Sequence, residues 1–338
     1  MPEQDNQLPP PTYLLHDGIP EEGLLTGVAG ESYITQLAIG QHDAIPQGSR
    51  VLLCLSDDKV RQLAETAIAA QWEVGILPHR QARQAMAALG VKGKVADVLR
   101  YYADRRSGPV DVLFCNGELV FSSVVIGRVL ALRPNDINRH QTVRSMLLGA
   151  LKGLTDLRLK AYKLVTGKDR EIKTAALGMV ALGHTQSALL EYAFTNELAV
   201  TDGRLALLSL APRSIVSYLL FILRLLLPGK IKLSQLPPSL SLIQTNRLHI
   251  SAPRGTEYLL DGKPVHTSEI ELEMRNDALQ LLPGPALTVR RVDAPRSHKE
   301  IVRLNDVPQG DGAGALVEQH LPLFTHATED EYRELFVA

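Results

Sequence analysis

A cluster of basic side chains, His79, Arg80 and Arg83, is the first candidate for chemistry in this sequence. It follows the apolar run of residues 72–78 and opens a helical pattern, so these groups stand in the first turn of an expected helix. Helix N-termini bind anions, and Arg binds phosphate through paired N–H groups. The cluster therefore predicts a site for a phosphate or a lipid headgroup. The alternative is a solvated first turn, although basic groups there oppose the helix dipole.

Acidic residues stand at three further places: Asp57-Asp58, Asp202 and Asp261. The first pair follows the apolar run of residues 50–55 and is followed by Lys59, which could offset one of the two negative charges. Two adjacent carboxylates repel a phosphate unless Mg²⁺ lies between the carboxylates and the phosphate. Asp202 and Asp261 each precede a glycine, and an Asp-Gly pair in a β-rich segment is most often only a turn.

Composition limits the function. Lys and Arg total 36 and Asp and Glu total 37, giving a formal net charge of −1, which argues against a nucleic-acid-binding protein. Two cysteines, Cys54 and Cys115, make no disulfide framework, so we expect a cytoplasmic, reducing location. The apolar run of residues 205–229 is broken by charge, and a strand followed by a buried amphipathic helix explains it better than a membrane span.

The elements that would position these groups indicate two domains of different class. Strands over residues 50–55 and 72–78 alternate with helices over 56–71, 80–91 and 94–106, which predicts an α/β domain with a parallel sheet. Residues 110–127 predict a hairpin around Asn-Gly.

After one more helix, over residues 139–155, short alternating strands dominate from about residue 157, which predicts a β-sandwich. The expected fold class is thus α/β plus all-β. Its expected divisions are a tail (1–12), an α/β domain (13–135), a β-sandwich (136–290) and a C-terminal extension (291–338) that can return to the first domain.

Several short segments, in their order along the chain, resemble motifs of the diacylglycerol and sphingoid-type lipid kinases, with the NAD kinases as more distant relatives. These segments are Leu55-Ser56-Asp57-Asp58-Lys59, Pro78 to Gln84 with Leu89-Gly90, Asp111 with Asn116-Gly117, Asp202-Gly203, Asp261-Gly262-Lys263 and residues 271–284. The resemblance covers most of residues 45–285. It implies an α/β domain followed by a β-sandwich, in the arrangement of the diacylglycerol kinases.

The resemblance also implies roles for individual residues. Asp261 matches the general base of the family, and Asp202 matches an acidic residue of its metal network. Asp57, Lys59, Arg80 and Arg83 stand where the family binds ATP. An active protein of this kind would use ATP and Mg²⁺.

The phosphate-binding glycines of the family are replaced here. Leu55, Ser56 and Asp58 stand in the first motif and Arg80 in the second, although backbone N–H groups approach phosphate best where no Cβ intervenes. We therefore expect a non-catalytic protein that binds a lipid, an anionic small molecule or a protein partner. The alternative is an active lipid kinase that transfers the γ-phosphoryl group of ATP to a lipid hydroxyl. Peripheral membrane contact and a homodimer stay open.

Overall fold

The structure is a computed structural model of the whole chain, and it describes residues 11–17, 34–127, 159–182, 203–212, 216, 219–220, 239–265, 267–285 and 301–303. The chain divides into two units, Met1–Val110 with Asp277–Arg290, and Asp111–Asn276 with Arg291–Ala338. Strand β5 is divided between them, because residues 108–110 belong to the first unit and residues 111–115 to the second.

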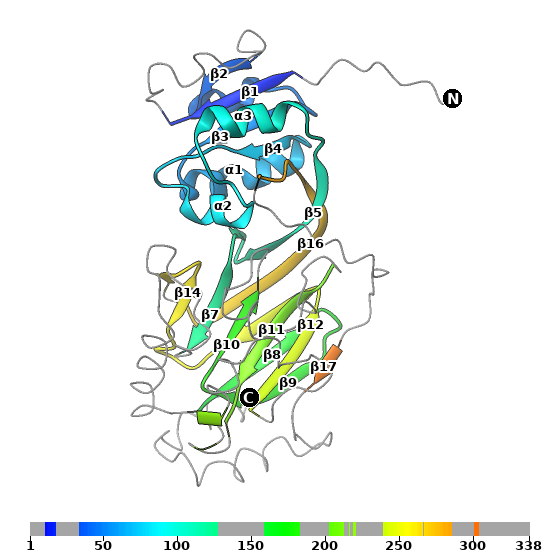
Figure 1. Cartoon of the computed structure of the whole chain (residues 1–338). Coiled ribbons are helices and arrows are strands. Elements are labelled where there is room, and N and C mark those ends of the chain that lie inside the picture. Colours follow the sequence, from blue (N-terminus) through cyan, green and yellow to red (C-terminus); the bar gives the residue numbers. More distant parts are fainter. Residues whose placement is uncertain are drawn as a thin grey trace, which may run out of the picture. The chain divides into compact units, whose positions relative to one another are not determined.

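The first unit is a parallel sheet with helices (Figure 1). Its elements are β1 (Thr12–His16), β2 (Ile34–Ala38), η2 (Ile39–Ala44), β3 (Arg50–Cys54), α1 (Asp57–Ala69), β4 (Glu73–Ile76), α2 (Arg83–Ala88), α3 (Val95–Ala103), the start of β5 (Gly108–Cys115) and the end of β16 (Glu269–Leu281). The strand order is β2-β1-β3-β4-β16, and each neighbouring pair is parallel.

The parallel order follows from the sequence pattern around β3, α1 and β4. Strand β3 is a run of buried apolar residues, as expected for a strand whose two faces are both covered. Helix α1 connects it to the parallel strand β4, and Val60, Leu63 and Ala64 lie on its buried side. Strands β1 and β2 were not predicted, because five-residue runs beside polar segments carry too little periodicity to be recognised.

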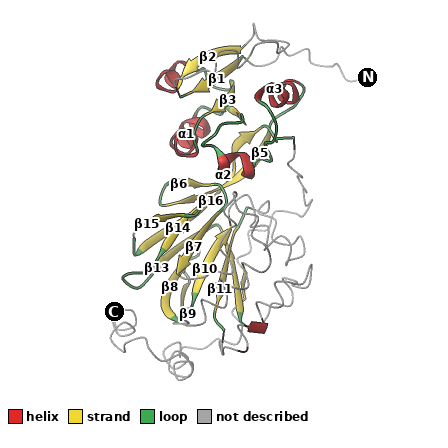
Figure 2. Cartoon of the chain, turned by 60° about the vertical axis from the view of Figure 1, so that its left-hand side comes forward, coloured by secondary structure: helices red, strands yellow, loops and turns green. Residues whose placement is uncertain are grey.

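In the residues that the structure describes, the second unit consists almost wholly of strands and loops (Figure 2). Besides the rest of β5 and β16 it contains β6 (Glu118–Val120), β7 (Ser123–Gly127), β8 (Lys160–Thr166), β9 (Glu171–Ala176), β10 (Gly178–Leu182), β11 (Leu205–Leu210), β12 (Leu240–Thr245), β13 (Arg247–Ser251), β14 (Tyr258–Leu260), β15 (Lys263–Val265) and β17 (Ile301–Arg303). One sheet has the order β16-β13-β8-β9, and the other β15-β14-β7-β10-β11-β12-β17.

The two sheets of this unit pack on a shared apolar core, which confirms the α/β plus sandwich class. Tyr162, Ile250 and Leu272 enter the core from the first sheet, and Ile126 and Leu207 enter it from the second. The outer side of the β16-β13-β8-β9 sheet carries paired charges instead. Glu171, for example, contacts Lys163 at 3.2 Å and Lys173 at 3.7 Å.

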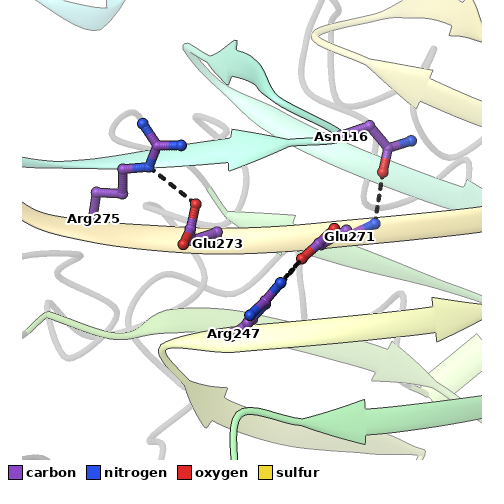
Figure 3. Close-up of polar contacts among 5 residues, drawn as sticks. All are labelled: Asn116, Arg247, Glu271, Glu273 and Arg275. Atoms are coloured by element: carbon purple, nitrogen blue, oxygen red, sulfur yellow. Dashed lines mark hydrogen bonds and ion pairs between the residues drawn. The ribbon is translucent and has the colours of Figure 1, made fainter. Parts of the chain in front are cut away.

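Asn116 docks the predicted Asn-Gly turn onto strand β16 (Figure 3). Its Oδ1 accepts a hydrogen bond from the backbone N–H of Glu271 at 2.7 Å, and its own backbone N–H donates to the carbonyl of that residue at 2.8 Å. Both turn residues have left-handed backbones, with φ of 49° at Asn116 and 81° at Gly117. Glu271 in turn pairs with Arg247, and Glu273 pairs with Arg275 at 3.0 Å. This turn is therefore structural.

Several sequence predictions lie outside the described residues. They are the helix over residues 139–155, most of residues 213–229 in the apolar run 205–229, and almost all of the tail and the C-terminal extension. Among the helices that the structure describes, none has the length and apolar character that crossing a membrane requires.

Candidate functional site

Three parallel strands of the first unit end at one edge of the sheet. Strands β1 and β3 are paired so that His16 lies opposite Cys54, and β3 and β4 so that Leu53 lies opposite Ile76. The residues that follow these ends therefore gather at the carboxyl edge. In open α/β sheets that edge is where ligands bind, so it is the first place to examine.

Asp57 is the first residue of α1, and its side chain turns toward helix α2. The residue is only 9% exposed. Its carboxylate accepts hydrogen bonds from the backbone N–H groups of Gln84, at 3.0 Å, and Ala85, at 2.9 Å. Ala82, the N-cap residue of α2, has no side chain able to cap the helix. Asp57 therefore supplies the cap from a distance and satisfies N–H groups that would otherwise face the edge.

The tertiary cap also explains the length of α2. The sequence predicted a helix from residue 80 to 91, whereas α2 runs from Arg83 to Ala88. The backbone N–H of Asp57 donates to the carbonyl of Gln81 at 3.0 Å, so Gln81 belongs to a loop that is fastened to the start of α1. The predicted helix loses its first turn because this loop hydrogen-bonds elsewhere.

Lys59 and His79 meet at a residue that the sequence analysis did not identify, Asp17. The Nζ of Lys59 lies 3.6 Å from one oxygen of Asp17, and the Nε2 of His79 lies 3.5 Å from the other. Asp17 directly follows strand β1. An aspartate after the apolar residues 13–15 was a usable signal, but it was missed because so short an apolar run was not recognised as a strand.

Arg80 and Arg83, the other two predicted anion-binding residues, are exposed beside this edge. Neither forms an ion pair with the part of the chain that the structure describes. Asp58, which the sequence placed where it would repel a phosphate, instead contacts Arg61 one turn along α1, at 3.0 Å. The edge thus presents Lys59, His79, Arg80 and Arg83, with Asp17 between the first two.

Asp261, the predicted general base, lies in the second unit and is 4% exposed. Its carboxylate accepts hydrogen bonds from three consecutive backbone N–H groups, those of Phe121 at 3.0 Å, Ser122 at 2.7 Å and Ser123 at 3.0 Å. Its own N–H donates to the carbonyl of Ser123 at 2.9 Å. Both carboxylate oxygens are therefore engaged by the backbone.

Asp261 is needed at this position because the chain passes here from one sheet to the other. The sequence predicted one strand after the Asn-Gly turn, but the chain breaks at Phe121 and Ser122 into β6, which pairs with β5, and β7, which joins the seven-stranded sheet. At such a break the backbone N–H groups have no neighbouring strand to donate to. Asp261 supplies the acceptors that buried N–H groups need there.

A buried thiol, that of Cys115, lies close to Asp261. Cys115 Sγ and Tyr258 Oη are 2.6 Å apart. Burial raises the pKa of the Cys115 thiol to about 12, although the hydrogen bond with Tyr258 opposes part of this effect. Burial likewise raises the pKa of Tyr258, and the neighbouring Cys115 adds to that shift. At neutral pH Cys115 is therefore a thiol and Tyr258 a phenol, so neither serves as a nucleophile.

The predicted metal ligand Asp202 lies outside the described residues, but its neighbour Gly203 is described. The N–H of Gly203 donates to the buried carboxylate of Asp111 at 3.0 Å. Gly203 has a φ of 76°, and a Cβ there would approach the Asn276 amide to 2.7 Å. Within the described ranges, no three His, Cys, Asp or Glu side chains are grouped so that they could hold a metal ion.

The comparisons with known proteins rest on structure. No protein-family model matches the sequence, and no curated protein matches it. A diacylglycerol kinase from Bacillus anthracis strain Sterne matches with a TM-score of 0.55 and 14% identity, over 83% of this chain and 99% of that chain. A second chain from that strain, assigned as a diacylglycerol kinase, matches with a TM-score of 0.58 and 13% identity, over 84% and 99% of the two chains. The predicted resemblance is thus confirmed at the level of the fold, and the chain has the fold of the diacylglycerol kinases.

Proposed function

We propose that this chain is a non-catalytic protein of the diacylglycerol kinase fold, which binds an anionic, lipid-type ligand and transfers no phosphoryl group. The observation that carries the proposal is the position of the Asp57 carboxylate. It occupies the N–H groups of Gln84 and Ala85, next to the edge where the resemblance implies nucleotide phosphates. A phosphoryl donor needs such preorganised donors, because its transfer depends mainly on positioning and charge stabilisation.

Two observations support the absence of ATP-dependent catalysis. Asp57 accepts backbone hydrogen bonds with both oxygens, so its carboxylate is committed to the start of α2. On the acceptor side, Asp261 already receives three N–H groups, so it has little capacity left to accept a proton from a lipid hydroxyl. We therefore assign neither ATP nor Mg²⁺ a role in this chain.

The proposed ligand class follows from the charges at the edge and from the fold. Lys59, His79, Arg80 and Arg83 are cations or N–H donors, and such groups bind phosphate-type anions. The proteins of like fold are diacylglycerol kinases by name, which suggests a lipid as the molecule that carries the anion. A phosphate-bearing lipid headgroup satisfies both arguments, and its binding would place the chain at a membrane surface.

A titration with Mg-ATP tests the absence of catalysis. We expect no saturable binding below about 1 mM, the upper end of the common range of KM values, and no radioactive phosphate in a lipid extract incubated with the protein and labelled ATP. A known diacylglycerol kinase, assayed with the same extract, is the positive control. Sub-millimolar binding together with labelled lipid would establish the alternative, an active lipid kinase.

The double substitution Arg80→Ala and Arg83→Ala tests the binding side of the proposal. Removing two exposed cations should weaken binding to vesicles of phosphatidic acid and phosphatidylcholine roughly thirtyfold at low salt, since each basic group near an anionic surface contributes about 1 kcal/mol. Arg100→Ala with Arg105→Ala removes the same charge around α3 and serves as the matched control. Equal binding by the two double variants would leave Arg80 and Arg83 as ordinary solvated residues.

A further inference from the structure

Asp17 forms a bridge across the carboxyl edge of the first unit. Its two oxygens face different partners, Lys59 Nζ at 3.6 Å and His79 Nε2 at 3.5 Å, and these partners follow strand β3 and strand β4 respectively. The carboxylate of Asp17 thus lies between the two groups of the edge that could hold a small anion. A carboxylate and a phosphate oxygen require the same donors, so the two compete for one place.

The orientation of the His79 ring supports this arrangement. The backbone N–H of Gln81 donates to His79 Nδ1 at 3.2 Å. A neutral imidazole that accepts at Nδ1 carries its proton on Nε2, so His79 presents a donor toward Asp17. The same hydrogen bond holds the ring in place when Asp17 is removed. His79 is therefore preset to donate to any acceptor at this position.

The bridge is loose and accessible. Charge-assisted N–H···O⁻ bonds normally measure about 2.7–2.9 Å, so contacts of 3.5 and 3.6 Å are weak ones. The side chains of Asp17, Lys59 and His79 are 22%, 36% and 19% exposed, so solvent reaches all three. Asp57, by contrast, is buried and forms short bonds, so it is a fixed part of the fold.

We propose that Asp17 is a built-in counter-ion, which a phosphate-type anion must displace in order to bind Lys59 and His79. This inference rests on the anion site of the proposed function and adds the residue that sets its affinity. In the free protein Asp17 neutralises Lys59 and disfavours anions that cannot outcompete one carboxylate. A doubly charged phosphate group binds in its place, with Arg80 and Arg83 nearby.

The variant Asp17→Asn tests the proposal. It removes one negative charge about 3.5 Å from both donors while keeping the side-chain shape, so we expect phosphate affinity to rise about five- to tenfold. Calorimetric titration with inorganic phosphate is one arm. Sedimentation with vesicles of phosphatidylcholine alone, or with added phosphatidic acid, is the other. A gain in both arms supports a general phosphate site, and a gain with phosphatidic acid vesicles alone supports a site for a lipid headgroup.

Three further variants keep the test decisive. Asp97→Asn removes the same charge from an exposed ion pair with Arg100 on α3, and its affinity should match that of the wild type. Asp17→Asn combined with Lys59→Gln should lose the gain, because the released donor is gone. Asp17→Ser gives a second way to remove the carboxylate if the Asn variant folds poorly.

The inference is overturned if Asp17→Asn and Asp17→Ser bind both probes no better than the wild type, or if Asp97→Asn gains equally. That outcome leaves the proposed absence of catalysis standing, because catalysis is tested separately with Mg-ATP. Conversely, phosphate transfer to lipid would end the proposed function while leaving the measured effect of Asp17 on anion binding intact.

Discussion

Replacing Asp261 by Asn is expected to lower the free energy of unfolding of the second unit by about 3 kcal/mol, the scale for disrupting a buried charged hydrogen-bond network. The carboxylate accepts N–H groups from Phe121, Ser122 and Ser123 with both oxygens. An amide keeps one acceptor and turns an N–H₂ donor toward backbone donors. The backbone itself is not a cause, because Asn tolerates the left-handed φ of 48° as well as Asp does.

Hydrogen exchange gives the measurement its location. In the Asn variant the amides of residues 121–123 should exchange faster, and urea unfolding should shift to lower concentration. Asp169→Asn is the matched control, because Asp169 is also an aspartate with left-handed backbone in a turn, with φ of 54°, but it is exposed. Its stability should change by less than about 0.5 kcal/mol.

The result also separates two roles of Asp261. A general base that is not needed for folding would leave stability and exchange at wild-type values when changed to Asn, while any phosphorylation of lipid would disappear. Loss of stability of the expected size instead identifies Asp261 as the acceptor at the strand break between β6 and β7. Wild-type stability in the variant would therefore contradict the structural role argued from the three hydrogen bonds.

Replacing Gly284 by Ala is expected to destabilise the first unit by about 2–4 kcal/mol, at or above the usual range for overpacking, because backbone atoms must move. A Cβ at this position would lie 2.4 Å from the carbonyl oxygen of Leu89 and 2.8 Å from backbone atoms of Gly90. The N–H of Gly284 also donates to that Leu89 carbonyl at 2.9 Å. The segment after β16 and the end of α2 are thus in backbone contact.

Trp72 makes this prediction simple to measure. It is the single tryptophan of the chain, it is buried, and it lies in the first unit, so its fluorescence follows the unfolding of that unit in urea. Gly40→Ala is the control, since nothing lies within 4 Å of a Cβ there. That variant should be neutral or slightly stabilising. Equal midpoints for the two variants would show that the Leu89–Gly284 contact is not tight.

The sequence predicted the helices and strands well where local signals were strong. The apolar strands around residues 50–55 and 72–78, the helices after them, the Asn116-Gly117 turn and the β-rich second half are all present. These follow from hydrophobic periodicity and turn chemistry, which act over a few residues and can be recognised without knowledge of distant partners. The resemblance to the diacylglycerol kinases likewise depended on the order of short local motifs.

The candidate site could be predicted only in part from such local signals. Sequence reasoning identified Asp57, Lys59, Arg80, Arg83 and Asp261, and their functional roles remain predictions. It missed Asp17, because the significance of that residue comes from Lys59 and His79, more than 40 residues away in the chain. It also placed the helix after β4 too early, since the cap of α2 comes from Asp57 and not from a neighbouring residue.

The amino-acid sequence by itself thus determined the class of each half of this protein, and the loss of glycine where a phosphate-binding fold would keep it. Only the tertiary structure decided what the remaining charged groups do. An aspartate is the same letter in the sequence whether its carboxylate faces a backbone N–H, a lysine or solvent. Its chemistry depends on how close the nearest donor lies. That distance is set by how the strands pair, and for Asp17, Asp57 and Asp261 the partners come from distant parts of the chain.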